Sequence, residues 1–96
     1  MGRSKKGIEF VNMWSVYVIG EARKQIKKFP RFEQERIRDS LNRLRENPFN
    51  LDVIRLGDKD HTWRLRVGNY RLFLELFQKE KAIFIYNIKR RTSTTY

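Results

Sequence analysis

Arginines recur along the second half of the sequence at a spacing that suits the binding of phosphate groups. Arg64 and Arg66 are two residues apart, and Arg71 follows soon after a Gly-Asn pair. A guanidinium group donates N–H groups from a rigid planar fork that matches the oxygens of a phosphate. A second basic run comes near the end of the chain. The candidate phosphate-binding residues are therefore Arg64, Arg66, Arg71, Lys89, Arg90 and Arg91.

The charge balance of the whole chain agrees with an anionic partner. The 96 residues include 22 Lys and Arg against 11 Asp and Glu, which gives a formal net charge of +11. Such a field attracts polyanions and speeds encounter with nucleic acid. Composition alone does not distinguish RNA from DNA, an acidic protein or an anionic membrane surface.

Composition also narrows the kinds of site that the chain can hold. The sequence has no Cys, so disulfides and Cys-based zinc sites are excluded. We expect no metal and no cofactor, because His, Cys and carboxylate side chains form no convincing cluster and His61 looks like a loop histidine. Apolar stretches fall well short of the ~20 residues that a membrane span needs. We therefore expect a cytoplasmic protein without membrane contact.

These residues need elements to hold them, and the N-terminal half predicts one strand and two helices. Residues 14–18 are rich in β-branched and aromatic side chains, which is typical of a strand. Residues 21–28 and 31–46 carry apolar side chains at helical spacing. The second helix should stop before Pro48, because the residue that precedes a proline avoids helical angles. Its buried stripe is predicted to contain Ile37, Leu41, Leu44 and either Phe29 or Phe32.

The C-terminal half predicts strands, because apolar and polar residues alternate with a period of two. Gly68 and Asn69 should form a tight type II′ turn that joins two of these strands into a hairpin. The alternation places Arg64, Arg66 and Arg71 on one face of the hairpin. The main predicted strands cover residues 63–67, 70–77 and 82–88, with a short strand at 53–56 and a polar tail at 89–96.

The main elements follow the order β-α-α-β-β-β, which predicts an α+β fold. Two N-terminal helices should pack on one face of a mostly antiparallel sheet. The other face is then free to meet solvent or a partner, and the arginines are expected there. Residues 1–12 are interpreted as a flexible basic extension and residues 13–96 as one domain.

Aromatic residues accompany the cations in this region. Phe73 and Phe77 share the strand face of Arg71, so they could stack on bases, contact a protein partner or pack in the core. Four other aromatic residues are predicted to belong to the core. These are Trp14, Trp63, Phe84 and Tyr86.

The hairpin sequence resembles a motif of the RelE/ParE superfamily of bacterial toxins. Those domains typically have a helix that ends before Asn-Pro, a hairpin of the form Tyr-Arg-Leu-Arg-Val-Gly-Asp-Tyr-Arg-Leu, and a last strand that closes in Lys-Arg. The matching pieces are residues 46–48, 64–71 and 88–96. The resemblance implies a toxin of a type II toxin–antitoxin system that is neutralised by an acidic antitoxin.

Two branches of this superfamily imply different activities. RelE-like members cut messenger RNA (mRNA) in the ribosomal A site, whereas ParE-like members inhibit DNA gyrase and lack a cleavage site. RelE-like members place an arginine after the last strand and a tyrosine six residues later, and Arg90 and Tyr96 have this spacing. The resemblance therefore favours a ribosome-dependent endoribonuclease whose partners are the ribosome and mRNA. The alternatives are a gyrase-inhibiting toxin and a degenerate member that only binds its antitoxin or RNA.

The same resemblance suggests roles for individual residues. Arg71 corresponds to an arginine that contacts the scissile phosphate, and Arg64 corresponds to a catalytic lysine of some members. A second such lysine corresponds to Thr62, so the general base is not assigned. The remaining cations of the region, Arg66, Lys89 and Arg91, are expected to bind RNA phosphates.

Cleavage of RNA by its own 2′-hydroxyl needs a base for that hydroxyl, charge stabilisation at phosphorus and an acid for the leaving 5′-oxygen. The titratable candidates near the end of the chain are Lys89 and Tyr96. We hypothesise that Tyr96 stacks on a base or takes the 2′-proton. Arg90 would then serve the leaving group or stabilise charge.

Simpler interpretations exist for the same residues. Exposed arginines on a strand are usually a solvated face, and Arg66 could pair with Glu75 instead of binding phosphate. The basic run that begins at Lys89 could be an ordinary charged terminus, and Tyr96 could be a disordered end.

Overall fold

The computed structural model describes residues 13–57 and 61–90. The predicted extension (residues 1–12) and the candidates Arg91 and Tyr96 lie outside the described residues. Within the described part, the elements are β2 (Ser15–Val18), α1 (Gly20–Ile26), α2 (Arg31–Glu46), the 3-10 helix η2 (Pro48–Asn50), β3 (Val53–Arg55), β4 (Thr62–Val67), β5 (Tyr70–Phe77) and β6 (Ala82–Arg90).

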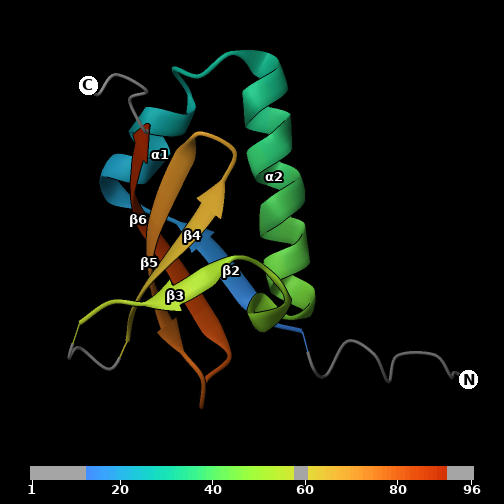
Figure 1. Cartoon of the computed structure of the whole chain (residues 1–96), viewed down its shortest axis with the longest axis vertical. Coiled ribbons are helices and arrows are strands. Elements are labelled where there is room, and N and C mark those ends of the chain that lie inside the picture. Colours follow the sequence, from blue (N-terminus) through green and yellow to red (C-terminus); the bar gives the residue numbers. More distant parts are fainter. Residues whose placement is uncertain (1–12, 58–60, 91–96) are drawn as a thin grey trace, which may run out of the picture.

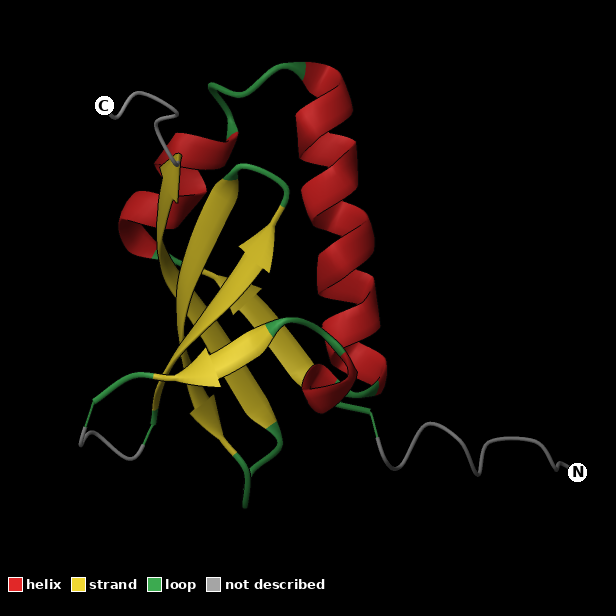
Figure 2. Ribbon diagram, viewed as in Figure 1, coloured by secondary structure: helices red, strands yellow, loops and turns green. Residues whose placement is uncertain are grey.

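Among the described residues, five strands form one sheet in the order β2-β6-β5-β4-β3, with the helices packed against it (Figure 1). The first and last of these strands in the chain, β2 and β6, are parallel, and every other neighbouring pair is antiparallel. α1 contacts β6, and α2 contacts β2 and β4. In Figure 2, α2 runs along one side of the strands and α1 lies by the end of β6. The predicted α+β fold is confirmed, and the short strand β3 closes one edge of the sheet.

The long helix α2 has the bounds that the sequence predicts. Ile37 and Leu44 are buried, whereas the side chain of Phe32 is 69% exposed. Phe29 packs against the core instead, so Phe29 and not Phe32 completes the predicted buried stripe. The helix ends before Pro48, and the 3-10 helix that follows is capped by Asn47, whose Oδ1 accepts a hydrogen bond from the backbone N–H of Phe49 at 3.0 Å.

The inner face of the sheet, which the helices cover, carries the core. Along β5, buried residues alternate with partly exposed ones because successive side chains point to opposite faces. A register shift inserts one extra residue, Tyr86, into β6 opposite the Phe73–Leu74 step of β5. This bulge keeps both Ile85 and Ile88 in the core. The apolar residues buried on β4, β5 and β6 are Leu65, Val67, Tyr70, Leu72, Leu74, Leu76, Ile83, Ile85 and Ile88.

The last strand is longer than the sequence predicts. β6 continues through Lys89 and Arg90, which the sequence pattern places in the polar tail. The backbone of β5 offers hydrogen-bonding partners as far as its first residue, Tyr70, and this pairing extends the strand although the side chains are charged. The longer strand matters for the site, because strand pairing fixes the face on which each of the two cations lies.

The turn between β4 and β5 is held against α2. Gly68 has φ +57°, a left-handed value that suits the first position of the predicted type II′ turn. A Cβ added at Gly68 would lie 2.8 Å from Cζ of Arg36, so the guanidinium of this α2 residue packs directly on the turn. Among the described residues, no helix is long and apolar enough to cross a membrane.

Candidate functional site

Three cations line up across the open face of the sheet, the face that the helices leave uncovered. Arg66 of β4 lies opposite Arg71 of β5, and Arg71 lies opposite Lys89 of β6. Directly paired residues share one face, and their Cβ atoms are about 4.5–5.5 Å apart. We call these three residues the cation row. The predicted common face of Arg64, Arg66 and Arg71 is confirmed, although the direct partner of Arg71 is Arg66 and not Arg64.

Arg64 lies beside the cation row, opposite Phe73. The Nε atoms of Arg64 and Arg71 are buried, and neither has a hydrogen-bond partner among the described residues. A buried donor without a partner costs about 1–3 kcal/mol, and like charges directly opposite each other destabilise a sheet. An anion bound over the row would supply the opposite charge that this like-charged row lacks.

Arg66 has an ion-pair partner within the protein. Its Nε lies 3.3 Å from Oδ2 of Asp52, and the two side chains are 46% and 53% exposed. A pair this exposed contributes about 0–1 kcal/mol, so an anionic ligand can compete for Arg66. The alternative pairing with Glu75 does not occur in the structure, because Glu75 lies opposite Thr62 and Phe84, away from the cation row.

Arg90 does not join the cation row. It lies opposite Tyr70, whose side chain is buried on the helix-covered face, so Arg90 is directed to that face. The positive charge of Arg90 acts there on the hydroxyl of Tyr70. The structure therefore brings Arg64, Arg66, Arg71 and Lys89 together and leaves Arg90 apart.

A contact that the sequence does not reveal fixes the start of β5, next to Arg71. The hydroxyl of Tyr70 donates a hydrogen bond to a carboxylate oxygen of Glu33 in α2. The Tyr70 ring stacks on Phe29 with centroids 4.5 Å apart. Burial, followed by the hydrogen bond and charge of Glu33, raises the pKa of Tyr70, whereas the positive charge of Arg90 opposes the rise. The partners are 37 residues apart in sequence, so no local pattern signals this contact.

The aromatic residues divide between the core and the open face. Trp14 is buried and Trp63 packs against the core, as predicted. The prediction for Phe84 is wrong, because its pairing with Glu75 places it on the open face. Tyr86 also stays outside the core, since it is the extra residue of the bulge. The apolar content of β6 favours full burial, but among the described residues the helices cover one face of the sheet and leave the other open.

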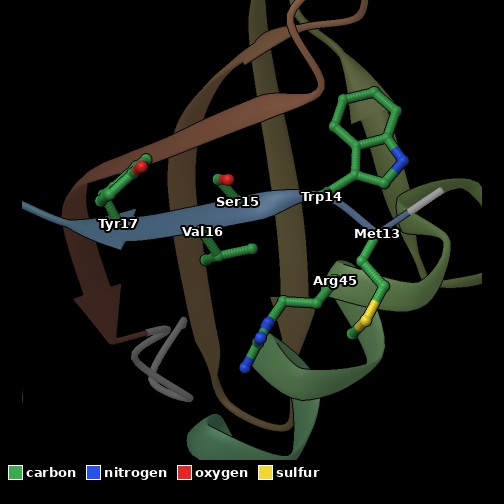
Figure 3. A pocket seen from close by; sticks show the side chains of 6 residues that line it. All are labelled: Met13, Trp14, Ser15, Val16, Tyr17 and Arg45. Atoms are coloured by element: carbon green, nitrogen blue, oxygen red, sulfur yellow. The ribbon is translucent and has the colours of Figure 1, made fainter. Parts of the chain in front are cut away.

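A hollow of about 450 Å³ lies elsewhere, along the free edge of β2 (Figure 3). It is lined by residues 13–17 and by Arg45 at the end of α2, and Figure 3 shows Ser15 and Tyr17 on one side of β2 with Val16 on the other. None of the cation row lines it. The described residues also contain no group of three or more His, Cys, Asp or Glu side chains that could hold a metal ion.

Solved structures of bacterial and archaeal toxins have the same fold. The archaeal RelE–RelB complex from Pyrococcus horikoshii is 24% identical over 85% of this chain and 99% of that chain, with a TM-score of 0.74. RelBE2 from Mycobacterium tuberculosis is 20% identical over 82% of this chain and 99% of that chain, with a TM-score of 0.71. The isolated Escherichia coli RelE toxin is 14% identical over 84% of this chain and 87% of that chain, with a TM-score of 0.69.

Comparison of the sequence with known proteins and family models shows which family the chain belongs to. No curated protein matches the chain significantly. A family model described as the ParE toxin of the type II toxin–antitoxin system parDE matches residues 17–94, which include both helices, the β4–β5 hairpin and the cation row. The chain therefore belongs to the ParE toxin family, within the RelE/ParE superfamily of toxins from type II toxin–antitoxin systems.

Proposed function

We propose that this toxin is a ribosome-dependent endoribonuclease that cleaves translated mRNA. The observation that supports this proposal most directly is the cation row with Arg64 beside it, because the register gathers four cations on one face of the sheet. The phosphates of an RNA backbone supply the negative oxygens that guanidinium groups bind in a bidentate manner.

In the proposed reaction, the 2′-oxygen loses its proton and bonds to phosphorus while the bond from phosphorus to the 5′-oxygen breaks. The leaving 5′-oxygen gains a proton, and the products are a 2′,3′-cyclic phosphate and a 5′-hydroxyl. Negative charge builds up on the phosphorane oxygens between these states. Arg71 and Arg64 stabilise that charge, which is a form of catalysis that fixed donors provide efficiently.

Proton transfer needs a titratable group close to Arg71. Lys89 meets this condition, because it lies opposite Arg71 in the register. We assign Lys89, in place of Arg90, to the leaving 5′-oxygen, since Arg90 is directed to the other face. Tyr96 stays the candidate for the 2′-proton on the strength of its spacing from Arg90 alone.

An acidic antitoxin is the proposed inhibitor. Two of the solved relatives described above are complexes of a RelE toxin with its antitoxin. The net charge of +11 on this chain favours an acidic segment. Such a segment would neutralise the toxin by covering the cation row, so binding of antitoxin and RNA should be mutually exclusive.

The activity is tested with purified ribosomes programmed with mRNA, by mapping new 5′ ends through primer extension. We expect cuts at codon boundaries that require translation. Arg71→Ala should lower the cleavage rate by roughly 10²–10³-fold, as loss of a charge-stabilising donor does, and Arg71→Lys should restore part of it. Arg38→Ala is the matched control, because Arg38 is exposed on α2 and its loss removes the same charge. Equal rates for Arg71→Ala and Arg38→Ala would refute the assignment.

Inhibition of DNA gyrase is the second candidate function, because the matching family model is that of ParE toxins. A supercoiling assay with purified gyrase separates the two. If the toxin abolishes supercoiling by gyrase and produces no new mRNA ends, gyrase inhibition is its function and the proposed mRNA cleavage is wrong. Absence of both effects would favour a member that only binds its antitoxin or RNA.

A further inference from the structure

A second row of side chains crosses the open face, further along the strands from the cation row. Thr62 lies opposite Glu75, Glu75 lies opposite Phe84, and Phe84 lies opposite Tyr17 of β2. We call Thr62, Glu75, Phe84 and Tyr17 the distal row. It joins a hydroxyl, a carboxylate and two aromatic rings from four neighbouring strands.

The aromatic part of the distal row is accessible and belongs to a larger group. The rings of Tyr17 and Phe84 are stacked, with centroids 5.2 Å apart and planes 16° from parallel. Phe77 meets Phe84 edge to face at 5.9 Å, and His61 lies 4.4 Å from Phe77. Tyr17 is 49% exposed. The rings therefore order one another without being covered by a helix.

We propose that the distal row binds a base of single-stranded RNA and prefers guanine. The inference rests on the proposed function, because it deepens the description of the same RNA surface. Proteins that bind single strands combine a basic track for the backbone with aromatic rings on which bases stack. The open face has both parts, the cation row at one end and the aromatic rings at the other.

The spacing of the two rows assigns them to different nucleotides. Arg71 and Glu75 are four residues apart on β5, which corresponds to about 13 Å at ~3.3 Å per residue. This distance is too long for the phosphate and base of one nucleotide. The distal row therefore contacts a nucleotide that flanks the one whose phosphate meets Arg71.

Glu75 supplies the base preference. Its side chain is exposed and makes no ion pair within the described part of the chain. A carboxylate repels phosphate but accepts hydrogen bonds from a base edge. Guanine presents N1–H and N2–H side by side, which match the two carboxylate oxygens. Uracil presents one N–H between two carbonyl oxygens that the carboxylate repels, so guanine should bind best and uracil worst.

The test measures binding of short, labelled 2′-O-methyl RNAs, which lack the attacking hydroxyl and stay intact. A run of uridines is compared with the same run that carries one guanosine. The wild-type protein should bind the guanosine probe roughly tenfold more tightly, in the range of a good bidentate contact. Glu75→Gln should bind the uridine probe more tightly, because the repelling carboxylate is lost, and should lose most of the guanosine preference, because the paired acceptor is lost with it. Glu80→Gln, in the turn after β5, removes the same charge and should keep the preference.

Stacking is tested with Phe84→Leu and, independently, with the more exposed Tyr17→Leu. Each variant, once its cooperative thermal unfolding is confirmed, should weaken binding of both probes by about tenfold. Wild-type affinity in these variants, together with an unchanged guanosine preference in Glu75→Gln, would overturn the inference while leaving the ribosome assay of Arg71→Ala intact. Weaker binding of purified antitoxin with unchanged RNA binding would also overturn it, because the row would then be a protein surface. Failure of the wild type both to bind RNA and to cut mRNA would remove the proposed function and this inference together.

Discussion

Removing the hydroxyl oxygen of Tyr70 tests whether its hydrogen bond to Glu33 stabilises the start of β5. Tyr70→Phe keeps the ring that stacks on Phe29 but deletes the hydroxyl that donates to Glu33. A hydrogen bond to a charged group contributes about 1.5–3 kcal/mol. Glu33 is only half-buried and water can partly replace the donor, so we expect a loss near the lower end, about 1–2 kcal/mol. For a domain of this size, that corresponds to a fall in Tm of roughly 4–15 °C.

The assay is urea unfolding followed by circular dichroism, for the wild type, Tyr70→Phe, Glu33→Ala and the double variant. The cycle should give a coupling energy of at least about 0.5 kcal/mol between the two positions, as expected for residues in contact. A loss below about 0.5 kcal/mol in Tyr70→Phe, or additive effects in the double variant, would refute the reasoning that this contact stabilises the fold.

The same residue gives the protein a dependence on alkaline pH. The pKa of Tyr70 is raised above 10.0 in the folded state. Above pH 10 the unfolded chain therefore loses this proton before the folded protein does, so the unfolded state binds fewer protons. The free energy of unfolding should then fall as pH rises from 10 through the folded-state pKa of Tyr70. Below pH 10, the contribution of Tyr70 to the free energy of unfolding should not change with pH. Tyr70→Phe should lack this component of the fall.

Two further changes probe the hairpin and the cation row. Gly68→Ala should destabilise the protein by about 1–2 kcal/mol in urea unfolding, because a left-handed φ strains any residue with a Cβ. Adding Arg36→Ala to this variant should relieve only the steric contact between the new Cβ and the Arg36 guanidinium, so the backbone strain should remain. Asp52→Asn should change the free energy of unfolding by less than about 1 kcal/mol yet tighten RNA binding and steepen its salt dependence, because Arg66 gains freedom to meet a phosphate. An unchanged salt slope would mean that Arg66 takes no part in binding.

Strong local periodicity explains why much of the fold could be predicted. The bounds of α2 and β5 follow from helical spacing, Pro48 and clean alternation. The same alternation gave the common face of Arg64, Arg66 and Arg71. The predicted two-residue turn at Gly68 and Asn69 also sets the register of this hairpin, which makes Arg66 the neighbour of Arg71. The register of β6 was not available in this way, because it depends on how a separate strand aligns and on a bulge.

The remaining errors arise where long-range pairing overrides local character. Polar side chains at Lys89 and Arg90 suggested a tail, but pairing with β5 made them part of a strand and sent them to opposite faces. Phe84 looked like a core residue because it is apolar, yet none of the helices that the structure describes covers its face. The contact of Tyr70 with Glu33 depends on the packing of α2 on the sheet, which no spacing within either element reports.

The parallel pairing of β2 with β6 links the order of folding to the order of synthesis. Residues 15–18 pair with residues 82–85, so the sheet closes only after β6 has been made. Contacts this distant in sequence carry a large loop-closure entropy and form slowly. Lys89 comes from the same strand, so a nascent chain has no complete cation row until β6 has left the ribosome and found its place.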